Sequence, residues 1–379
     1  MVYDESSMST IFSNESRQYL WRLLWSALAE GQSIQGLPHT TITAEQVKEL
    51  YDVCEQPIDL SNNSIDAHKE EFESRCKLSK DIVGIGADRT YVEDNANVLL
   101  MRFGHEAIVE KINYLIVQLA VLAEKNCSAK CICHVDNTNA INVTTTTVGK
   151  RICAWINDLD LAHDQVCMAH DQLAMVGFKA DVGNQTAASA LFGGDRTKAD
   201  ALDKFVCDKF GMDTMMIANK TYSRIYDSTT ANAISLVAQA LSNLAHNLHV
   251  LHLAGEMRVN VELCGTIYDD AARVLSLQQR VSTVTAVQWM DDTIDVAAIR
   301  GTVIPEMFIH TYDCIINMIT VIEGIEIDQA KCIENLLHRQ YRVDTSKYDA
   351  VVAPDGVIGF AREQTMDYLE AIYNKYDPD

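Results

Sequence analysis

Residues Thr230–Glu256 read TANAISLVAQALSNLAHNLHVLHLAGE, and this stretch decides the fold. Its apolar residues recur at spacings of three and four, which places them along one side of a helix. They are Ile234, Val237, Leu241, Leu244, Leu248 and Leu251. Gly255 stands where a helix favours a left-handed C-cap. We therefore expect a long helix that ends there and buries one side against other helices.

Three more stretches share this periodicity, at residues 108–122, 148–173 and 308–322, and a shorter one covers 268–280. Only 5 prolines and 17 glycines interrupt the 379 residues, which is sparse for a β-rich protein. Helices of this length bury their apolar sides against one another. The sequence therefore predicts an all-α fold with a central bundle of long helices at residues 96–324.

Bulk composition narrows the classes of function. The net charge of -22 opposes binding to nucleic acid or to anionic membranes, because both partners are themselves negative. The 11 cysteines are scattered without a paired framework, and the first residues are polar and acidic rather than a signal peptide. No apolar run is long enough to span a membrane. We expect a cytoplasmic protein with reduced cysteines.

Two groups of side chains have the chemistry of metal ligands. They are Cys127, Cys131, Cys133 and His134, and the row His246, His249 and His252. The first spacing matches no common zinc site, so we expect an ordinary reduced loop there. The histidines turn about 60° around the helix at each step, which favours a solvated flank. We predict no metal and no cofactor. Zinc in a purified sample would instead indicate a metal or redox module.

Several short segments occur in an order that resembles one known family. They are Trp21–Trp25, Tyr91–Asn95, Thr146–Arg151, Gly183–Gln185, Leu191–Asp195, Ala201–Lys204, Lys220–Arg224 and Val287–Trp289. Together they are similar to the eukaryotic adenylosuccinate lyases of the fumarase/aspartase superfamily. The resemblance runs from residue 1 to about residue 340.

The resemblance implies a three-domain, all-α subunit. It divides this chain into an N-terminal helical domain at 1–95, a central helix-bundle and oligomerisation domain at 96–324, and a shortened C-terminal domain at 325–379. The family's subunits form homotetramers in which three subunits build each active site. The reaction is a β-elimination that releases fumarate from adenylosuccinate, and from a related carboxamide ribotide, in purine synthesis. It uses no cofactor.

The family's catalytic base is a serine on a mobile loop that reads Gly-Ser-Ser-x-Met-Pro-x-Lys-x-Asn-Pro. Here the segment from Met257 to Cys264 contains neither serine nor lysine, and only about nine residues lead into the next helical pattern. We therefore expect the loop to be absent. Aligned without gaps, the general-acid histidine is replaced by Asn139. His134 could fill that role only if about five residues were inserted behind it, and this alternative stays open.

The positions that hold substrate in the family are partly retained. Those that still match are Tyr3, Thr138, Gln185, Arg224 and Arg300. Those that differ are Asn62–Ser64 in place of Arg-His-Asp, Asp88-Arg89 in place of Thr-Ser, Lys220 in place of glutamine, Asp292 in place of arginine and Ala297 in place of serine. The retained arginines could equally pair with acids such as Asp227 and Asp295.

A positioned acid or base contributes about 10² to 10⁴ in rate, and one charge-stabilising donor about 10² to 10³. Losing the base, its loop and the acid removes most of the acceleration. Our hypothesis is a catalytically inactive lyase homologue with a structural or regulatory role. It would act through self-association, as a homotetramer or as a mixed tetramer with an active paralogue. The alternative is an active adenylosuccinate lyase that uses His134 and an unrecognised base.

Overall fold

The computed structural model describes residues 7–58, 64–135, 143–179, 182–289, 297–340 and 358–377, and most of them are helical. The predicted all-α fold is confirmed. Contacts divide the chain into two compact units. Unit 1 contains residues 1–107, 167–232 and 277–309, and unit 2 contains residues 108–166, 233–276 and 310–379. The boundaries of the three expected domains stay a prediction.

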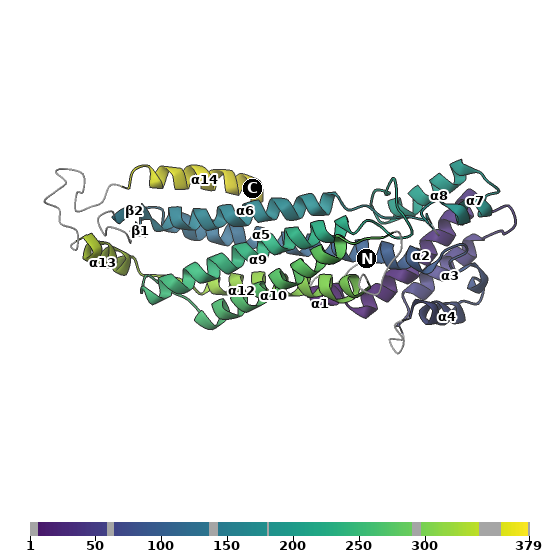
Figure 1. Cartoon of the computed structure of the whole chain (residues 1–379), viewed down its shortest axis with the longest axis horizontal. Helices are drawn as coiled ribbons and strands as arrows, with labels where there is room; N and C mark the ends of the chain where they lie inside the picture. The colour runs from purple at the N-terminus through teal and green to yellow at the C-terminus, as the bar shows by residue number, and fades with distance from the viewer. Residues whose placement is uncertain are drawn as a thin grey trace. The chain divides into compact units, whose positions relative to one another are not determined.

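The helices are α1 (Met8–Ile11), α2 (Asn14–Gln35), α3 (Ala44–Cys54), α4 (Ile65–Arg75), η1 (Lys80–Ile82), α5 (Arg89–Lys125), α6 (Val148–Asp171), α7 (Thr186–Leu191), α8 (Arg196–Lys209), α9 (Ile225–Leu253), α10 (Val261–Thr285), η2 (Ile299–Val303), α12 (Ile304–Glu323), α13 (Gln329–Gln340) and α14 (Ala361–Tyr376) (Figure 1). The strands are β1 (Lys130–Val135), β2 (Val143–Thr147), β3 (Met257–Arg258) and β4 (Glu326–Ile327). They form two antiparallel pairs, β1 with β2 and β3 with β4.

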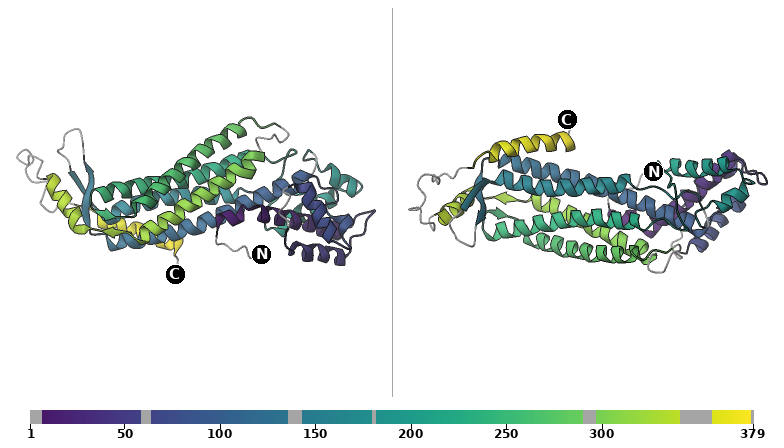
Figure 2. Two further views of the ribbon diagram at one scale, coloured as in Figure 1. Left: turned by 90° about the horizontal axis from the view of Figure 1, so that it is seen from below. Right: turned by 45° about the horizontal axis from the view of Figure 1, so that its top comes forward.

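Unit 2 is built from long helices that run side by side, as the views in Figure 2 show. Five of the six predicted positions on α9, from Ile234 to Leu248, are buried. Gly255 has φ of 74°, and the Glu256 N–H donates to the Leu251 carbonyl at 3.0 Å. This bond closes the end of the helix in the way a left-handed glycine permits. The predicted seam and its C-cap are confirmed.

One prediction about unit 2 is wrong. Residues 130–135, expected as a loop, form strand β1, which pairs with β2 from Lys130–Thr147 to Val135–Val143. The partner strand reads Val-Thr-Thr-Thr-Thr, and such β-branched residues favour extended backbone. Helix α13 packs on this pair. The helical periodicity that dominates the chain gave no signal for so short a hairpin.

Unit 1 is organised around α2, which packs against α3, α4 and α8. Leu20, Leu24 and Leu28 on α2 are fully buried. At the start of α3, Thr43 Oγ1 accepts from the Gln46 backbone N–H at 3.3 Å, and the Gln46 side-chain oxygen Oε1 accepts from the Thr43 backbone N–H at 3.0 Å. The predicted capping box is confirmed, and it satisfies two backbone donors that the helix leaves free.

Among the helices that the structure describes, none is both long and apolar enough to cross a membrane.

Candidate functional site

Arg300 in η2 is the centre of a buried cluster within unit 1. Its Nε donates to Asp227 Oδ2 at 3.0 Å and its Nη1 to Asp94 Oδ1 at 3.1 Å. A third bond runs from Nη1 to Thr221 Oγ1 at 2.8 Å, and the guanidinium carbon lies 3.7 Å from the centre of the Tyr222 ring. All three charged side chains are at most 4% exposed. Two carboxylates therefore already neutralise this arginine.

Tyr222 closes the same cluster. Its hydroxyl donates to Asp227 Oδ1 at 2.8 Å, and its backbone N–H donates to Asp94 Oδ2 at 3.2 Å. Burial raises the pKa of Tyr222 well above its usual range, so the phenol stays neutral. Asp94, Asp227 and Arg300 thus satisfy one another without a ligand. Of the two acids expected to pair with retained arginines, Asp227 does pair with Arg300, and Asp295 lies outside the described residues.

Arg224 joins the start of α9 to the end of α10. Its backbone N–H donates to Gln288 Oε1 at 2.8 Å, and its Nη1 donates to the Val284 carbonyl at 3.0 Å. The side chain is buried. These two bonds go to the protein's own backbone and to a side-chain amide, which agrees with a structural role.

Gln185 and Lys220 lie on two loops that approach each other closely in unit 1. A Cβ at Gly183 would lie 2.0 Å from the Ala218 carbonyl oxygen, so only glycine fits between them. Gln185 has φ of 58° and, among the residues that the structure describes, is the only non-glycine residue with positive φ. Its backbone N–H donates to the Lys179 carbonyl at 2.8 Å. Lys220 is exposed.

Several residues that the resemblance selected cannot be placed. Tyr3, Thr138 and Asn139 lie outside the described residues, as do Asn62, Asn63 and Asp292. The backbone of His134 pairs with Thr144 in the β1–β2 ladder, and its side chain is not among those described. The assignment of a general acid stays a prediction.

Asp88 has a local role at the start of α5. Its Oδ1 accepts from Thr90 Oγ1 at 2.8 Å and from the Tyr91 N–H at 3.0 Å, which is the geometry of an N-cap. Arg89 is exposed and lies 3.8 Å from Asp66. The Asp88 carboxylate therefore holds the end of this helix.

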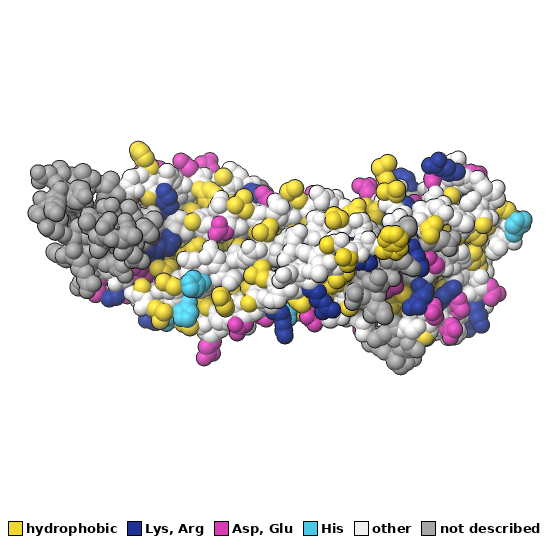
Figure 3. All heavy atoms as spheres, in the orientation of Figure 1, with side chains coloured by type: hydrophobic (Ala, Val, Ile, Leu, Met, Phe, Trp, Pro, Cys, Tyr) yellow, Lys and Arg dark blue, Asp and Glu magenta, His cyan; other side chains and the backbone are white. Residues whose placement is uncertain are grey.

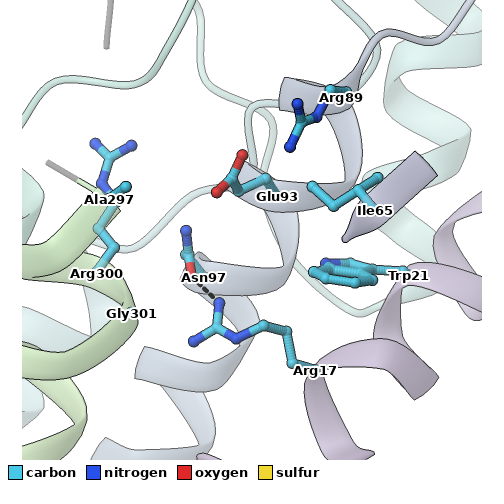
Figure 4. A pocket seen from close by; sticks show the side chains of 9 residues that line it. All are labelled: Arg17, Trp21, Ile65, Arg89, Glu93, Asn97, Ala297, Arg300 and Gly301. Atoms are coloured by element: carbon cyan, nitrogen blue, oxygen red, sulfur yellow. Dashed lines mark hydrogen bonds between the residues drawn. The ribbon is translucent and has the colours of Figure 1, made fainter. Parts of the chain in front are cut away.

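A cavity of about 170 Å³ opens beside the Arg300 cluster, entirely within unit 1 (Figure 4). It is lined by Arg17, Trp21, Ile65, Arg89, Glu93, Asn97, Ala297, Arg300 and Gly301. The Arg17 guanidinium donates to the Asn97 side-chain oxygen. Below, this space is called the unit 1 cavity.

Sequence reasoning missed most residues of the unit 1 cavity. Arg17 and Trp21 are four apart on α2, and Arg89, Glu93 and Asn97 repeat every four residues on α5. Residues at this spacing share one face of a helix. That spacing was a usable signal for each helix. Nothing local in the sequence indicated that the two faces meet across 80 residues of chain.

The connection between α9 and α10 is short and firmly held in unit 2. It comprises residues 254–260, and β3 within it pairs with β4. The Asp328 N–H donates to the Glu256 carbonyl at 2.9 Å. The buried Glu256 carboxylate accepts hydrogen bonds from Arg151 Nη1 at 3.1 Å and from Asn335 Nδ2 at 3.2 Å. Backbone and side-chain bonds together fix this turn.

No family model matches the chain. It is 28% identical to adenylosuccinate lyase of Schistosoma mansoni over 352 residues, which is 85% of this chain and 72% of that protein. It is 27% identical to the adenylosuccinate lyase of Saccharomyces cerevisiae over 352 residues, 86% of this chain and 72% of the relative. It is 26% identical to the adenylosuccinate lyase of Caenorhabditis briggsae over 348 residues, which is 85% of this chain and 72% of that protein.

Solved structures share the fold. A 3-carboxy-cis,cis-muconate lactonizing enzyme from Pseudomonas putida superposes with a TM-score of 0.80 at 16% identity, covering 97% of each chain. A fumarate lyase from Mesorhizobium sp. BNC1 gives 0.75 at 15% identity, covering 100% of this chain and 89% of that one. The sequence relatives and the shared fold point the same way. The chain therefore belongs to the fumarase/aspartase superfamily, as a diverged homologue of adenylosuccinate lyase.

Proposed function

We propose that this protein is a non-catalytic homologue of adenylosuccinate lyase with a structural or regulatory role in an oligomer. The observation that carries the proposal is the connection between α9 and α10. Residues 254–260 contain neither serine nor lysine, and they are tied to β4, Arg151 and Asn335. The resemblance expects a mobile loop with the catalytic serine at this place. We interpret the short, fixed turn as the loss of that loop.

The state of the retained arginines supports the proposal. Arg300 is neutralised by Asp94 and Asp227, and Arg224 bonds to the Val284 carbonyl. An anionic substrate would have to compete with carboxylates already in place, at a cost in desolvation and repulsion. The elimination needs a base, an acid and donors for the developing negative charge. In unit 1, Nη1 of Arg224 and the guanidinium of Arg300 already bond to the protein itself.

Exposed hydrophobic side chains on the bundle helices of unit 2 support a role in association. Leu253 on α9 is 76% exposed and Tyr268 on α10 is 55% exposed, and Val250 and Ile316 are also accessible. On the face shown in Figure 3, such side chains lie among charged ones along the helices. Burying these side chains against another subunit would remove apolar surface from water, which favours association. We propose a homotetramer, or a mixed tetramer with an active paralogue.

We place this assembly in the cytoplasm. The ten cysteines that the structure describes are all free, which suits a reducing compartment.

The activity proposal is tested by incubating the purified chain with adenylosuccinate and following fumarate release by absorbance. An active adenylosuccinate lyase at the same concentration is the positive control. We expect a rate no higher than that of the buffer blank. Sustained turnover would contradict the proposal. If that turnover disappears in His134→Ala, the alternative of an active lyase with His134 as its acid takes its place.

The regulatory role is tested separately by mixing the chain with an active adenylosuccinate lyase before the assay. We expect mixed oligomers in native mass spectrometry and a specific activity that changes with the mixing ratio. Two populations that never exchange subunits, with additive activities, would contradict the mixed tetramer.

A further inference from the structure

Helix α9 carries a second row of side chains at helical spacing, and this row is exposed. Its members follow one another at alternating spacings of four and three residues. They are Asn232, Leu236, Gln239, Asn243, His246, Val250 and Leu253. Side chains at this spacing form a continuous stripe along one side of a helix. Below, these seven residues are called the outer seam, and they are distinct from the buried seam that begins at Ile234.

The outer seam lies in a stretch of α9 without ionised side chains. None of residues 228–253 is Asp, Glu, Lys or Arg, although these four types make up 22% of the chain. The neighbouring helix α10 differs, because it exposes Glu262, Asp269, Arg273 and Arg280. A chain with a net charge of -22 repels a second copy of itself, and that repulsion is weakest where both faces are uncharged. Of these two helix faces, the outer seam therefore fits a second copy better.

The apolar members of the outer seam lie on both sides of a polar centre. Leu236 is 39% exposed, Val250 is 50% exposed and Leu253 is 76% exposed, and the seam positions between Leu236 and Val250 are all polar. Burying the apolar side chains against another helix removes their surface from water, which favours association. Polar residues within a helix seam select one orientation and register of the partner. This pattern indicates a helix pair that is held at both ends and oriented by its centre.

An antiparallel pair of outer seams brings complementary side chains together. When Leu236 faces Leu253 of a second copy, Asn243 faces the second copy's His246, because the two pairs of residues share one midpoint. In a parallel pair each residue would instead face its own equivalent. The antiparallel pair also places the positive N-terminal end of each helix beside the negative C-terminal end of the other.

The polar groups at the centre suit this contact. The Asn243 amide has two hydrogens, and its Nδ2 donates to Asp158 Oδ2 on α6 at 3.4 Å. A neutral imidazole has one donor and one acceptor nitrogen. The ring of the second copy's His246 can therefore accept from Asn243 and donate to the Asp158 carboxylate beside it.

We propose that the outer seam of α9 binds the outer seam of a second copy of this chain in antiparallel orientation. The two-fold axis passes beside the midpoint between Leu244 and Ala245, and it makes each contact occur twice. Leu236 packs against the second copy's Leu253, and Asn243 bonds to the second copy's His246. This inference rests on the proposed association, for which it names the surface and the orientation, and it is independent of the proposed loss of catalysis.

The test is disulfide crosslinking of the full chain with cysteines introduced at the two ends of the outer seam. Leu236→Cys/Leu253→Cys should form a covalent dimer after mild oxidation, measured on a non-reducing gel. The two cysteines of one chain are about 25 Å apart along the helix, so they cannot bond to each other. Each single variant should give no more dimer than wild type, whose native cysteines set the background. A strong dimer in Leu236→Cys alone would show a parallel pair and contradict the proposal.

Analytical ultracentrifugation separates this proposal from the proposed association. Leu236→Asp places an unpaired charge against the second copy's Leu253 and should weaken association about tenfold or more. Ile34→Asp is the matched control, since Ile34 is 61% exposed on α2 in unit 1, and it should leave the mass unchanged. Far-UV circular dichroism checks that both variants are folded. A monomeric wild type would overturn both proposals, whereas an oligomer that resists Leu236→Asp and gives no crosslink would overturn only the outer seam.

A further variant tests the polar centre. Asn243→Leu/His246→Leu makes the middle of the seam apolar, so association should become tighter and the single orientation should be lost. Leu236→Cys added to this variant should then form a covalent dimer by itself. If the added cysteine still gives only the wild-type background, Asn243 and His246 do not set the orientation.

Discussion

The Arg300 cluster of unit 1 and the Glu256 cluster of unit 2 use the same chemistry in different ways. Arg300 is a buried cation between two buried carboxylates, Asp94 and Asp227. Glu256 is a buried anion with one partly exposed cation, Arg151, and the amide of Asn335. The first cluster contains an arginine that the resemblance selected, and the second holds the turn at which we propose that the catalytic loop is lost. In both clusters the charged groups are paired with other groups of the protein. We therefore expect substitutions in each cluster to lower the free energy of unfolding.

Of the substitutions in these two clusters, Arg300→Met should lower the free energy of unfolding most. It leaves Asp94 and Asp227 buried without their cation, and breaking a buried pair in this way costs about 3 to 5 kcal/mol. We expect that loss in the free energy of unfolding, measured by urea denaturation. Arg196→Met, on an exposed helix surface, is the control and should change it by less than about 0.5 kcal/mol. Equal stability of Arg300→Met and wild type would show that the cluster does not support the fold.

Glu256→Gln should have a smaller effect, since Arg151 is partly exposed and the new amide still accepts a hydrogen bond. We expect a loss of about 2 to 3 kcal/mol in the free energy of unfolding. Glu326→Gln breaks the neighbouring but exposed pair with Arg258 and should cost less than about 1 kcal/mol. If the two substitutions cost the same, burial does not distinguish the Glu256 pair.

A third buried group makes stability depend on pH. His105 is fully buried against Phe308, and burial lowers its pKa to about 3, whereas an unfolded histidine has a pKa near 6.5. Because the unfolded state binds the proton more readily, this stability is present above about pH 6.5 and is lost as the pH falls toward 3.

Protonation of His105 in the unfolded state should lower the free energy of unfolding by about 2 kcal/mol as the pH falls from 7 to 5. The slope is at most about 1.4 kcal/mol per pH unit. Urea denaturation at several pH values measures it. In His105→Leu the slope should fall by the part that one histidine contributes. His68, with a pKa lowered by burial to about 4, remains as a second source. An unchanged slope in His105→Leu would contradict the assignment.

The smallest effect concerns Asp88. Asp88→Ala removes the N-cap of α5 and should cost about 1 kcal/mol in the free energy of unfolding. Asp88→Thr introduces a hydroxyl, which also caps a helix, and should cost only a few tenths of a kcal/mol. If alanine and threonine are equally destabilising, capping is not what Asp88 contributes.

Sequence periodicity predicted the features of the fold that depend on a local sequence pattern. The seam on α9 repeats over six positions, and each repeat supports the others, so the helix and its glycine C-cap were predictable. The strand at Lys130–Val135 was missed because six residues give too few repeats to compete with the surrounding helical pattern. This strand is stabilised by pairing with β2, a contact that exists only in the folded chain.

The candidate site was predictable only in part. The resemblance selected Arg224 and Arg300, and acids were expected beside them, but the pairing of Arg300 with Asp94 crosses 206 residues and no local signal encodes it. The same holds for Arg17 and Asn97 in the unit 1 cavity. Which carboxylates lie against a given arginine depends on tertiary packing, and the local sequence pattern does not encode that packing.

The central claim is that the connection between α9 and α10 is a fixed turn and not a mobile catalytic loop. Hydrogen exchange of the amides in residues 254–260, followed by mass spectrometry with and without adenylosuccinate, tests it most directly. We predict slow exchange at the bonded amides of Gly255 and Glu256 in both conditions, because their N–H groups donate to carbonyls at 2.9 and 3.0 Å. Rapid exchange that becomes slow only when adenylosuccinate is added would reveal a substrate-closing loop and contradict the account.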